Sequence, residues 1–269
     1  MGQPEKAYKN LEFLNSAEAR ILRILSEYLE PRVRFQKQDV ENTIVFFGSA
    51  RLIDRDTAAA QVADCQRQVA HSPSAEYQHA LREAEHRLKL SRYYEDARAL
   101  AKLLTEWSHE KKNRKRGYLI TSGGGPGIME AANRGASEVP GGRSVGLNIS
   151  IPMEQGSNPY ITDELNFEFH YFFTRKFWFV YLAKALVVFP GGFGTLDELF
   201  EVLTLIQTRK VEKPLPVVLY GADYWRQLIN FDFLVDNLMI NPEDMNLLYF
   251  ADTPEEAFQY LSRRLNNHP

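Results

Sequence analysis

Two glycine-rich segments each follow an apolar run and lead into a helical pattern. They are residues 121–130 (TSGGGPGIME) and residues 190–198 (PGGFGTLDE). Glycines there let backbone N–H groups approach a phosphate, because a Cβ would block the approach. The first segment matches the dinucleotide fingerprint poorly, so a purely structural turn stays open for it. Together the two segments predict a pocket for an anionic ligand, with two helix N-termini pointing into it.

Three charged residues near these segments are candidates for chemistry. Arg175 and Lys176 lie between the segments, among aromatic residues. A cation in such surroundings is often retained by a partner or an anion, although a pair of solvated charges is the alternative. Glu198 could act as a carboxylate catalyst. Thr195 followed by Glu198 also has the spacing of a capping box, in which Glu198 would only stabilise a helix.

The elements that must position these residues alternate along the chain. We predict strands over residues 43–47, 117–121, 143–151, 167–171, 185–189 and 215–220, and helices over 128–138, around 175, over 195–209 and from 253 onward. Residues 57–112 are expected to form two helices broken near 71–74. The alternation predicts an α/β fold, a doubly wound, mostly parallel, Rossmann-like sheet with helices on both faces. Ligands bind such sheets beyond the carboxyl ends of the strands.

Composition indicates an ordinary soluble globular protein. Hydrophobic residues make up 44% of the chain, charged residues 25%, and the net charge of −3 does not favour a nucleic-acid partner. No apolar run approaches the roughly 20 residues of a membrane span, and no secretory signal is visible. The single cysteine, Cys65, fits a reducing compartment, so we expect a cytoplasmic protein. A helical extension over 1–40 is expected to precede one domain over 41–269 with a helical insertion at about 57–112.

The two glycine segments with an Arg-Lys pair between them resemble the LONELY GUY (LOG) family. Its motifs G-G-G-x-G-x-M and P-G-G-x-G-T-x-x-E match residues 123–129 and 190–198, and Arg175-Lys176 matches the pair. Members were long labelled lysine decarboxylases, but those tested are phosphoribohydrolases. They hydrolyse the N-glycosidic bond of adenine-type nucleoside 5′-monophosphates, including AMP and cytokinin riboside monophosphates. The resemblance covers roughly residues 43–237, and it implies a homo-oligomer without cofactor or metal.

The resemblance also assigns site residues. Arg175 and Glu198 become the catalytic pair. The residues expected to bind the substrate are Gly48, Ser49, Gly123, Gly124, Gly125, Gly127, Met129, Lys176, Gly191, Gly192, Gly194, Thr195 and Thr204. One position departs from the family, since Tyr160 stands near the place of an acidic residue. Its substitute could be Glu154, Asp163 or Glu164.

The chemistry can be argued from the residue types. Cleavage of a C–N glycosidic bond passes through a state with positive charge on the sugar, which a carboxylate stabilises while it orients or deprotonates water. We assign this role to Glu198. Arg175 would bind the phosphate bidentately or stabilise negative charge on the departing base.

Three other functions were weighed. A pyridoxal-phosphate decarboxylase needs a Schiff-base lysine, but nothing around Lys176 or Lys184 marks such a site. A non-catalytic protein that binds a nucleotide or phosphate-bearing cofactor remains the main alternative, because one fold hosts many functions. The basic run at 111–116 would suit nucleic acid, although such runs at helix ends are usually solvated.

Overall fold

The computed structural model describes residues 4–110, 117–152 and 156–266. In this part of the chain seven parallel strands form one sheet in the order β4-β3-β2-β1-β5-β6-β7. The strands are β1 (Asn42–Phe47), β2 (Tyr118–Ser122), β3 (Ser144–Ile149), β4 (Asn166–Phe169), β5 (Ala183–Val188), β6 (Val217–Tyr220) and β7 (Leu248–Ala251). From β1 the chain adds strands outward to β4 and then returns to place β5 on the other side of β1. The predicted doubly wound α/β fold is confirmed.

Helices connect and flank these strands. The α-helices are α1 (Leu11–Asn15), α2 (Arg20–Lys37), α3 (Arg55–His71), α4 (Ala75–Leu90), α5 (Arg92–Glu110), α6 (Ile128–Ser137), α7 (Phe172–Tyr181), α8 (Phe193–Gln207), α9 (Ala222–Leu228), α10 (Phe231–Asp236) and α11 (Pro254–Asn266). Three 3-10 turns are η1 (Ala7–Lys9), η2 (Asp163–Leu165) and η3 (Pro242–Leu247). No helix in the described ranges is long and apolar enough to cross a membrane.

The sheet is covered on both faces because its strands are apolar on both. In β1, Ile44 and Phe46 pack into the core beneath α5, α6 and α11. Val45 and Phe47 point the other way, into the core beneath α2, α7 and α8. This period of two is what a pleated strand imposes, and near-continuous apolar strands are typical of parallel sheets.

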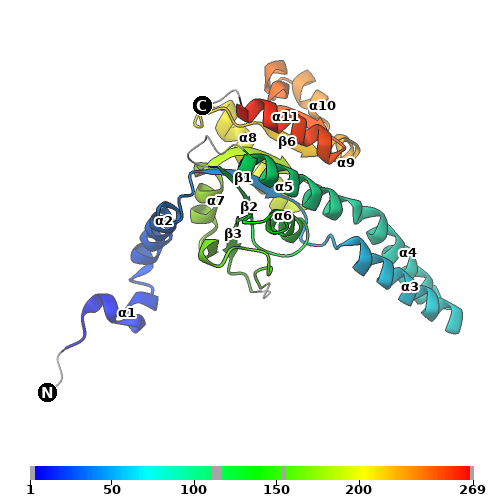
Figure 1. Ribbon diagram of the computed structural model, residues 1–269, viewed down its shortest axis with the longest axis horizontal. Coiled ribbons are helices and arrows are strands. Elements are labelled where there is room, and N and C mark those ends of the chain that lie inside the picture. Colours follow the sequence, from blue (N-terminus) through cyan, green and yellow to red (C-terminus); the bar gives the residue numbers. More distant parts are fainter. Residues whose placement is uncertain (1–3, 111–116, 153–155, 267–269) are drawn as a thin grey trace.

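The stretch that the sequence divided into two helices contains three. The break at residues 72–74 is where Ser74 begins α4 by accepting a hydrogen bond from the amide of Tyr77. A second break at Ser91 separates α4 from α5, whose Leu100 and Leu104 are buried against the sheet. The helix α5 is therefore a core crossover helix. The α3–α4 hairpin projects from the body on one side, and α1 and α2 extend from it on the other (Figure 1). The basic run at 111–116 lies outside the described residues.

Strand β7 is an element that the sequence analysis missed. It has four residues, Leu248–Ala251, too few for a strand periodicity to be recognised. It extends the sheet by pairing with β6.

Candidate active site

A cavity of about 730 Å³ opens at the carboxyl ends of β1 and β5, where the strand order reverses. This is the place where doubly wound sheets bind ligands. Its floor and walls come from the ends of both strands, the two glycine turns, α7, α8 and the base of the α3–α4 hairpin. The lining residues are Phe47, Gly48, Ser49, Ala50, Arg51, Leu52, Leu90, Gly123, Met129, Arg175, Phe179, Pro190, Gly191, Gly192, Phe193, Gly194, Thr195, Leu196, Glu198, Tyr224 and Leu228.

Arg175 and Glu198 meet at this cavity from two different helices. Nη2 of Arg175, on α7, lies 3.3 Å from Oε1 of Glu198, on α8. The side chains are only 13% and 9% exposed, respectively. Arg175 also lies against the rings of Phe172 and Phe179, and its Nε has no hydrogen-bond partner among the described residues. The pair is thus held in place while one N–H donor of the arginine stays unused.

Burial changes the acidity of this pair. It raises the pKa of Glu198 to about 7, although the positive charges of Arg175 and Lys176 oppose the rise. Burial also lowers the pKa of Arg175, yet a guanidinium remains protonated in proteins. A carboxyl group poised near neutral pH beside a fixed cation is typical of a catalytic site.

The second glycine turn leaves the N-terminus of α8 open to the cavity. The helix begins at Phe193 with Gly192 as N-cap and no side-chain capping bond. The capping-box alternative is therefore wrong, because Thr195 is already the third residue of the helix and Glu198 pairs with Arg175. The first amides of an uncapped helix have no partner within it, so they can bind an anion. Gly191, Gly192, Gly194 and Thr195 all line the cavity.

The first glycine turn is mostly buried. Gly124 and Gly127 have φ values of +76° and +72°, which side chains rarely adopt. A Cβ on Gly127 would collide with the carbonyl oxygen of Ser49. That oxygen also accepts a hydrogen bond of 3.1 Å from the amide of Ile128, the first residue of α6. The N-terminus of α6 therefore packs against the end of β1, and the expectation that it opens into the cavity like α8 is wrong.

The predicted substrate-binding residues thus fall into three groups. Those that line the cavity are Gly48, Ser49, Gly123, Met129, Gly191, Gly192, Gly194 and Thr195. Gly124, Gly125 and Gly127 are buried beside it and shape the turn, and two further residues lie elsewhere. The amine of Lys176 binds Asp197 at 2.8 Å and Glu201 at 2.9 Å. Thr204 donates to the carbonyl of Phe200 and faces another surface groove.

No substitute for the family's acidic residue reaches the cavity among the described residues. Asp163 and Glu164 are exposed on η2, and Glu154 lies outside the described ranges. Tyr160 instead lies against Arg134, whose guanidinium carbon is 5.6 Å from the centroid of the tyrosine ring. The preceding Asn158 donates from its side chain to the carbonyls of Gly124 and Gly125, which ties this loop to the first glycine turn.

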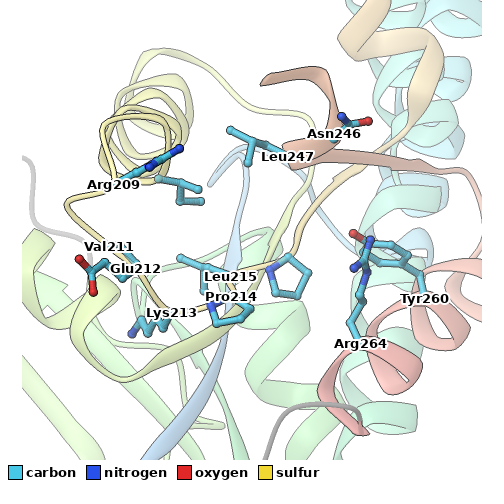
Figure 2. A pocket seen from close by; sticks show the side chains of 12 residues that line it. Arg209, Val211, Glu212, Lys213, Pro214, Leu215, Asn246, Leu247, Tyr260 and Arg264 are labelled. Atoms are coloured by element: carbon cyan, nitrogen blue, oxygen red, sulfur yellow. The ribbon is translucent and has the colours of Figure 1, made fainter. Parts of the chain in front are cut away.

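A second hollow, of about 470 Å³, lies at the opposite edge of the sheet, where residues leading into β6 and β7 form its floor. Figure 2 shows Lys213 and Glu212 on one side of it and Tyr260 and Arg264 on the other. The Lys213 amine is already bonded to the carbonyls of Val180 and Tyr181. Arg264 lies over the ring of Tyr260. The hollow brings no carboxylate–cation pair or open helix terminus together, so the cavity with Arg175 and Glu198 is the candidate active site.

Comparison with known proteins points to the same residues. The family described as "Possible lysine decarboxylase" matches residues 129–261, which include Arg175 and Glu198. Over residues 129–261 the chain is similar to the LOG family. The older label is the one that LOG members carried, and the lysine it would suggest, Lys176, is neutralised by Asp197 and Glu201 outside the cavity. In the described ranges no cluster of His, Cys, Asp and Glu is arranged to hold a metal ion.

Individual relatives share part of the chain. A probable cytokinin riboside 5′-monophosphate phosphoribohydrolase of Oryza sativa is 34% identical over 88 residues, which is 32% of this chain and 34% of that protein. One from Arabidopsis thaliana is 28% identical over 151 residues, 56% of this chain and 74% of that protein. The pyrimidine/purine nucleotide 5′-monophosphate nucleosidase of Escherichia coli K12 is 31% identical over 155 residues, 52% of this chain and 33% of that protein. The chain thus matches about a third of the rice and bacterial relatives.

One solved structure can be set beside this fold. The molybdenum cofactor binding protein of Rippkaea orientalis aligns with 84% of this chain and 98% of its own, at 16% identity and a TM-score of 0.49. A likeness this distant carries no inference about the site.

Several cavity residues were missed by the sequence analysis. Tyr224, Phe179, Leu52 and Leu90 line the cavity, and Tyr224 donates a hydrogen bond of 2.7 Å to the carbonyl of Gly191. They come from four elements, α9, α7, the β1–α3 connection and α4, and none stands in a motif. Only the strand order brings them to one place. They give the cavity an apolar wall beside the glycine turn, with Tyr224 bonded to the turn itself.

Proposed function

We propose that this protein hydrolyses the N-glycosidic bond of adenine-type nucleoside 5′-monophosphates, AMP or a cytokinin riboside monophosphate. The products are the free base and ribose 5-phosphate. The observation that carries the proposal is the buried Arg175–Glu198 pair, 3.3 Å apart, beside the open N-terminus of α8. The names of the rice, Arabidopsis and bacterial relatives support the same reaction class.

The phosphate of the substrate fits the N-terminus of α8. The amides of Phe193, Gly194 and Thr195 are the first of that helix, and no side chain caps them. Backbone amides and the helix dipole together favour a doubly charged group there. The phosphate then serves as a remote handle, because its binding energy fixes the ribose against Glu198.

The reaction adds water across the C1′–N bond. As that bond breaks, its electron pair leaves with the base and positive charge develops on the sugar. The Glu198 carboxylate stabilises that charge and receives a proton from water, whose oxygen bonds to C1′; the departed base then takes up a proton from solvent, and Glu198 returns its own proton to solvent. Arg175 keeps the carboxylate in place, and because it lines the cavity its guanidinium charge also acts on the phosphate or on the departing base. The apolar wall provides a surface for the base to pack against.

A protein that binds a nucleotide without cleaving it is the second candidate. It would use the same α8 N-terminus and apolar wall. A glutamate whose pKa is raised to about 7 favours catalysis, since binding a doubly negative phosphate beside an extra carboxylate gains nothing.

The test is product analysis with purified protein. AMP, isopentenyladenosine monophosphate, a pyrimidine monophosphate and adenosine are incubated separately, and free base is measured by chromatography. Release from monophosphates but not from adenosine is expected, and the ratio among the monophosphates identifies the preferred base. Binding of AMP without release of any base would favour the non-catalytic alternative.

The same proposal includes a homo-oligomer in the cytoplasm. Helix α2 carries a row of exposed apolar residues beside exposed aromatic residues of α7; they are Ile21, Leu22, Leu25, Leu29, Val33, Phe172, Phe173 and Tyr181. Exposed apolar patches of this kind mark interaction surfaces. Light scattering after size-exclusion chromatography should give a mass above that of one chain, which Leu25→Glu should reduce. A monomer at every concentration would contradict this part.

A further inference from the structure

The helix that carries Arg175 lacks a cap of its own. Helix α7 begins at Phe172, and its N-cap residue Tyr171 makes no side-chain capping bond. The N-terminus of a helix leaves backbone donors without partners and carries partial positive charge. A negatively charged group placed near this end therefore stabilises the helix.

That group is Glu27, in the middle of the N-terminal helix α2. Its Oε1 accepts a hydrogen bond of 2.7 Å from the amide of His170, and its Oε2 accepts one of 3.2 Å from the amide of Tyr171. The hydroxyl of Thr174 donates to the same Oε2 at 2.6 Å. One carboxylate, more than 140 residues earlier in the chain, thus accepts three bonds where α7 begins, two from the amides of the residues just before the helix and one from a hydroxyl of its first turn.

Other contacts hold α2 in place independently of this carboxylate. The indole N–H of Trp178 donates to the backbone carbonyl of Glu27 at 3.0 Å. The ring of Phe35 lies 4.7 Å from that of Phe167 and 5.5 Å from that of Trp178. Arg34 donates to the carbonyl of Asn166. A change at the Glu27 side chain should therefore leave α2 docked.

The first turn of α7 is also where Arg175 leaves the backbone. Its amide donates to the carbonyl of Tyr171, the residue whose own amide is held by Glu27. Thr174, the next residue back along the helix, is the third donor to Glu27. Arg175 points from this turn into the cavity, where it meets Glu198. A rotation or fraying of this turn would move the guanidinium away from the carboxylate.

We infer that Glu27 is a positioning residue of the proposed active site, a cap supplied by α2 that fixes the first turn of α7 and thereby Arg175. The inference rests on the proposed function. It gives the N-terminal segment, which lies outside the LOG motifs, a part in the reaction although it contributes nothing to the cavity lining.

The test combines kinetics with amide hydrogen exchange on the full chain. Glu27→Ala should lower kcat for AMP about tenfold, because a small displacement of a catalytic group costs that much or more. KM should change less than threefold, since the open N-terminus of α8 is untouched. Glu27→Gln keeps one acceptor oxygen, so its kcat should fall between those of the wild-type protein and Glu27→Ala. Glu30→Gln is the matched control, because Glu30 lies on α2 and, within the described part of the chain, pairs with Arg34 of the same helix.

A double-mutant cycle separates positioning from general stability. In an Arg175→Lys background, Glu27→Ala should reduce kcat less than twofold further, because the group it positions has been replaced. Equal losses in both backgrounds, or a loss no larger than that of Glu30→Gln, would overturn the inference.

Hydrogen exchange distinguishes this inference from the proposed function. Glu27→Ala should speed exchange of a peptide spanning residues 170–175 at least tenfold, with little change in α8. Unchanged exchange there overturns the inference about Glu27, even if AMP is cleaved. Absence of base release by the wild-type protein overturns the proposed function, whatever the exchange shows.

Discussion

The two glycine turns are alike in sequence context but differ in what their glycines do. In the first turn, Gly124 and Gly127 are needed by the fold, because both have positive φ and a Cβ on either would strike a neighbour. In the second turn, Gly192 and Gly194 have negative φ and open space where a Cβ would stand. Nothing in the protein itself requires those two positions to be glycine.

The difference separates structural glycines from binding glycines. The first turn closes α6 onto the end of β1 through the Ser49 carbonyl, so its backbone groups are used within the protein. The second turn leaves the amides of α8 without partners, so its glycines are explained by a ligand that must come close. Substitutions at Gly124 and Gly127 should change stability, and those at Gly192 and Gly194 should change binding and catalysis, whereas a Cβ on Gly191 would collide with Thr195.

The largest effect is expected at Glu198, in the second turn of α8. Glu198→Gln should lower kcat for AMP by roughly 10²–10⁴-fold, because a neutral amide cannot stabilise the developing positive charge. AMP affinity by calorimetry and the melting temperature should change little, since glutamine keeps the shape and an acceptor for Arg175. Glu201→Gln, one turn further along α8, is the control. A Glu198→Gln protein with full activity would refute the assignment.

The next largest effect is expected on the unfolding free energy when a glycine of the first turn is replaced. Gly127→Ala should cost about 3 kcal/mol of unfolding free energy, because it combines a strained positive φ with a collision against the Ser49 backbone. Gly141→Ala is matched to it, since Gly141 has φ of +74° with nothing within 4 Å. That control should cost only about 1–2 kcal/mol. Urea denaturation measures the unfolding free energy of both variants. Equal losses would show that the Ser49 backbone moves away and that the collision adds nothing.

The second turn should respond in the opposite way. Gly194→Ala should leave the unfolding free energy unchanged or raise it by up to about 1 kcal/mol, because alanine is the better residue in a helix. KM for AMP should nevertheless rise roughly tenfold, since the new methyl group faces the phosphate position. If the unfolding free energy instead fell by more than about 2 kcal/mol and KM did not change, Gly194 would be a structural glycine.

The pH dependence tests the state of Glu198. Because burial raises its pKa to about 7, the carboxylate is progressively protonated below that pH. The reaction needs the ionised form, so kcat at saturating AMP should fall about tenfold per pH unit on the acid side. The bound phosphate adds negative charge near Glu198. It therefore shifts the acid-side fall in kcat to higher pH. A kcat that stays flat from pH 5.5 to 8 would exclude a titrating carboxylate from the rate.

The smallest effect concerns the hydrogen bond that supports the second turn. Tyr224→Phe removes the donor to the carbonyl of Gly191, a bond worth about 1 kcal/mol. KM for AMP should rise roughly fivefold with kcat nearly unchanged, because the phosphate site loosens while Glu198 stays in place. Tyr77→Phe, on the exposed helix α4, should have no effect on either constant.

Local patterns predicted most of the architecture. The strands β1 to β6 were recognised because buried parallel strands are short, continuous apolar runs bounded by glycine or charge. The turns were recognised because glycines end those runs. The division between α4 and α5 at Ser91 was missed, since a single serine between two charged helical stretches gives no break signal. Strand β7 was missed because four residues cannot establish a period.

The candidate site was predicted in its residue types but less well in its contacts. Arg175 and Glu198 come together in one cavity, whereas the adjacent Lys176 binds Asp197 and Glu201 outside it. Neighbouring residues on a helix point about 100° apart, so only one of the two cations can face the cavity, and the motif does not say which. The direction depends on how α7 packs against α8.

The alternation of strands and helices, the two glycine turns and the two charged residues Arg175 and Glu198 can all be recognised in the amino-acid sequence alone. These are local properties, fixed by composition and spacing over a few residues. The tertiary structure decided which glycines line the cavity, that α8 rather than α6 opens into it, and that Glu27 caps α7. Those outcomes depend on contacts between residues far apart in the chain, and such contacts exist only once the strand order and the packing of the helices are fixed.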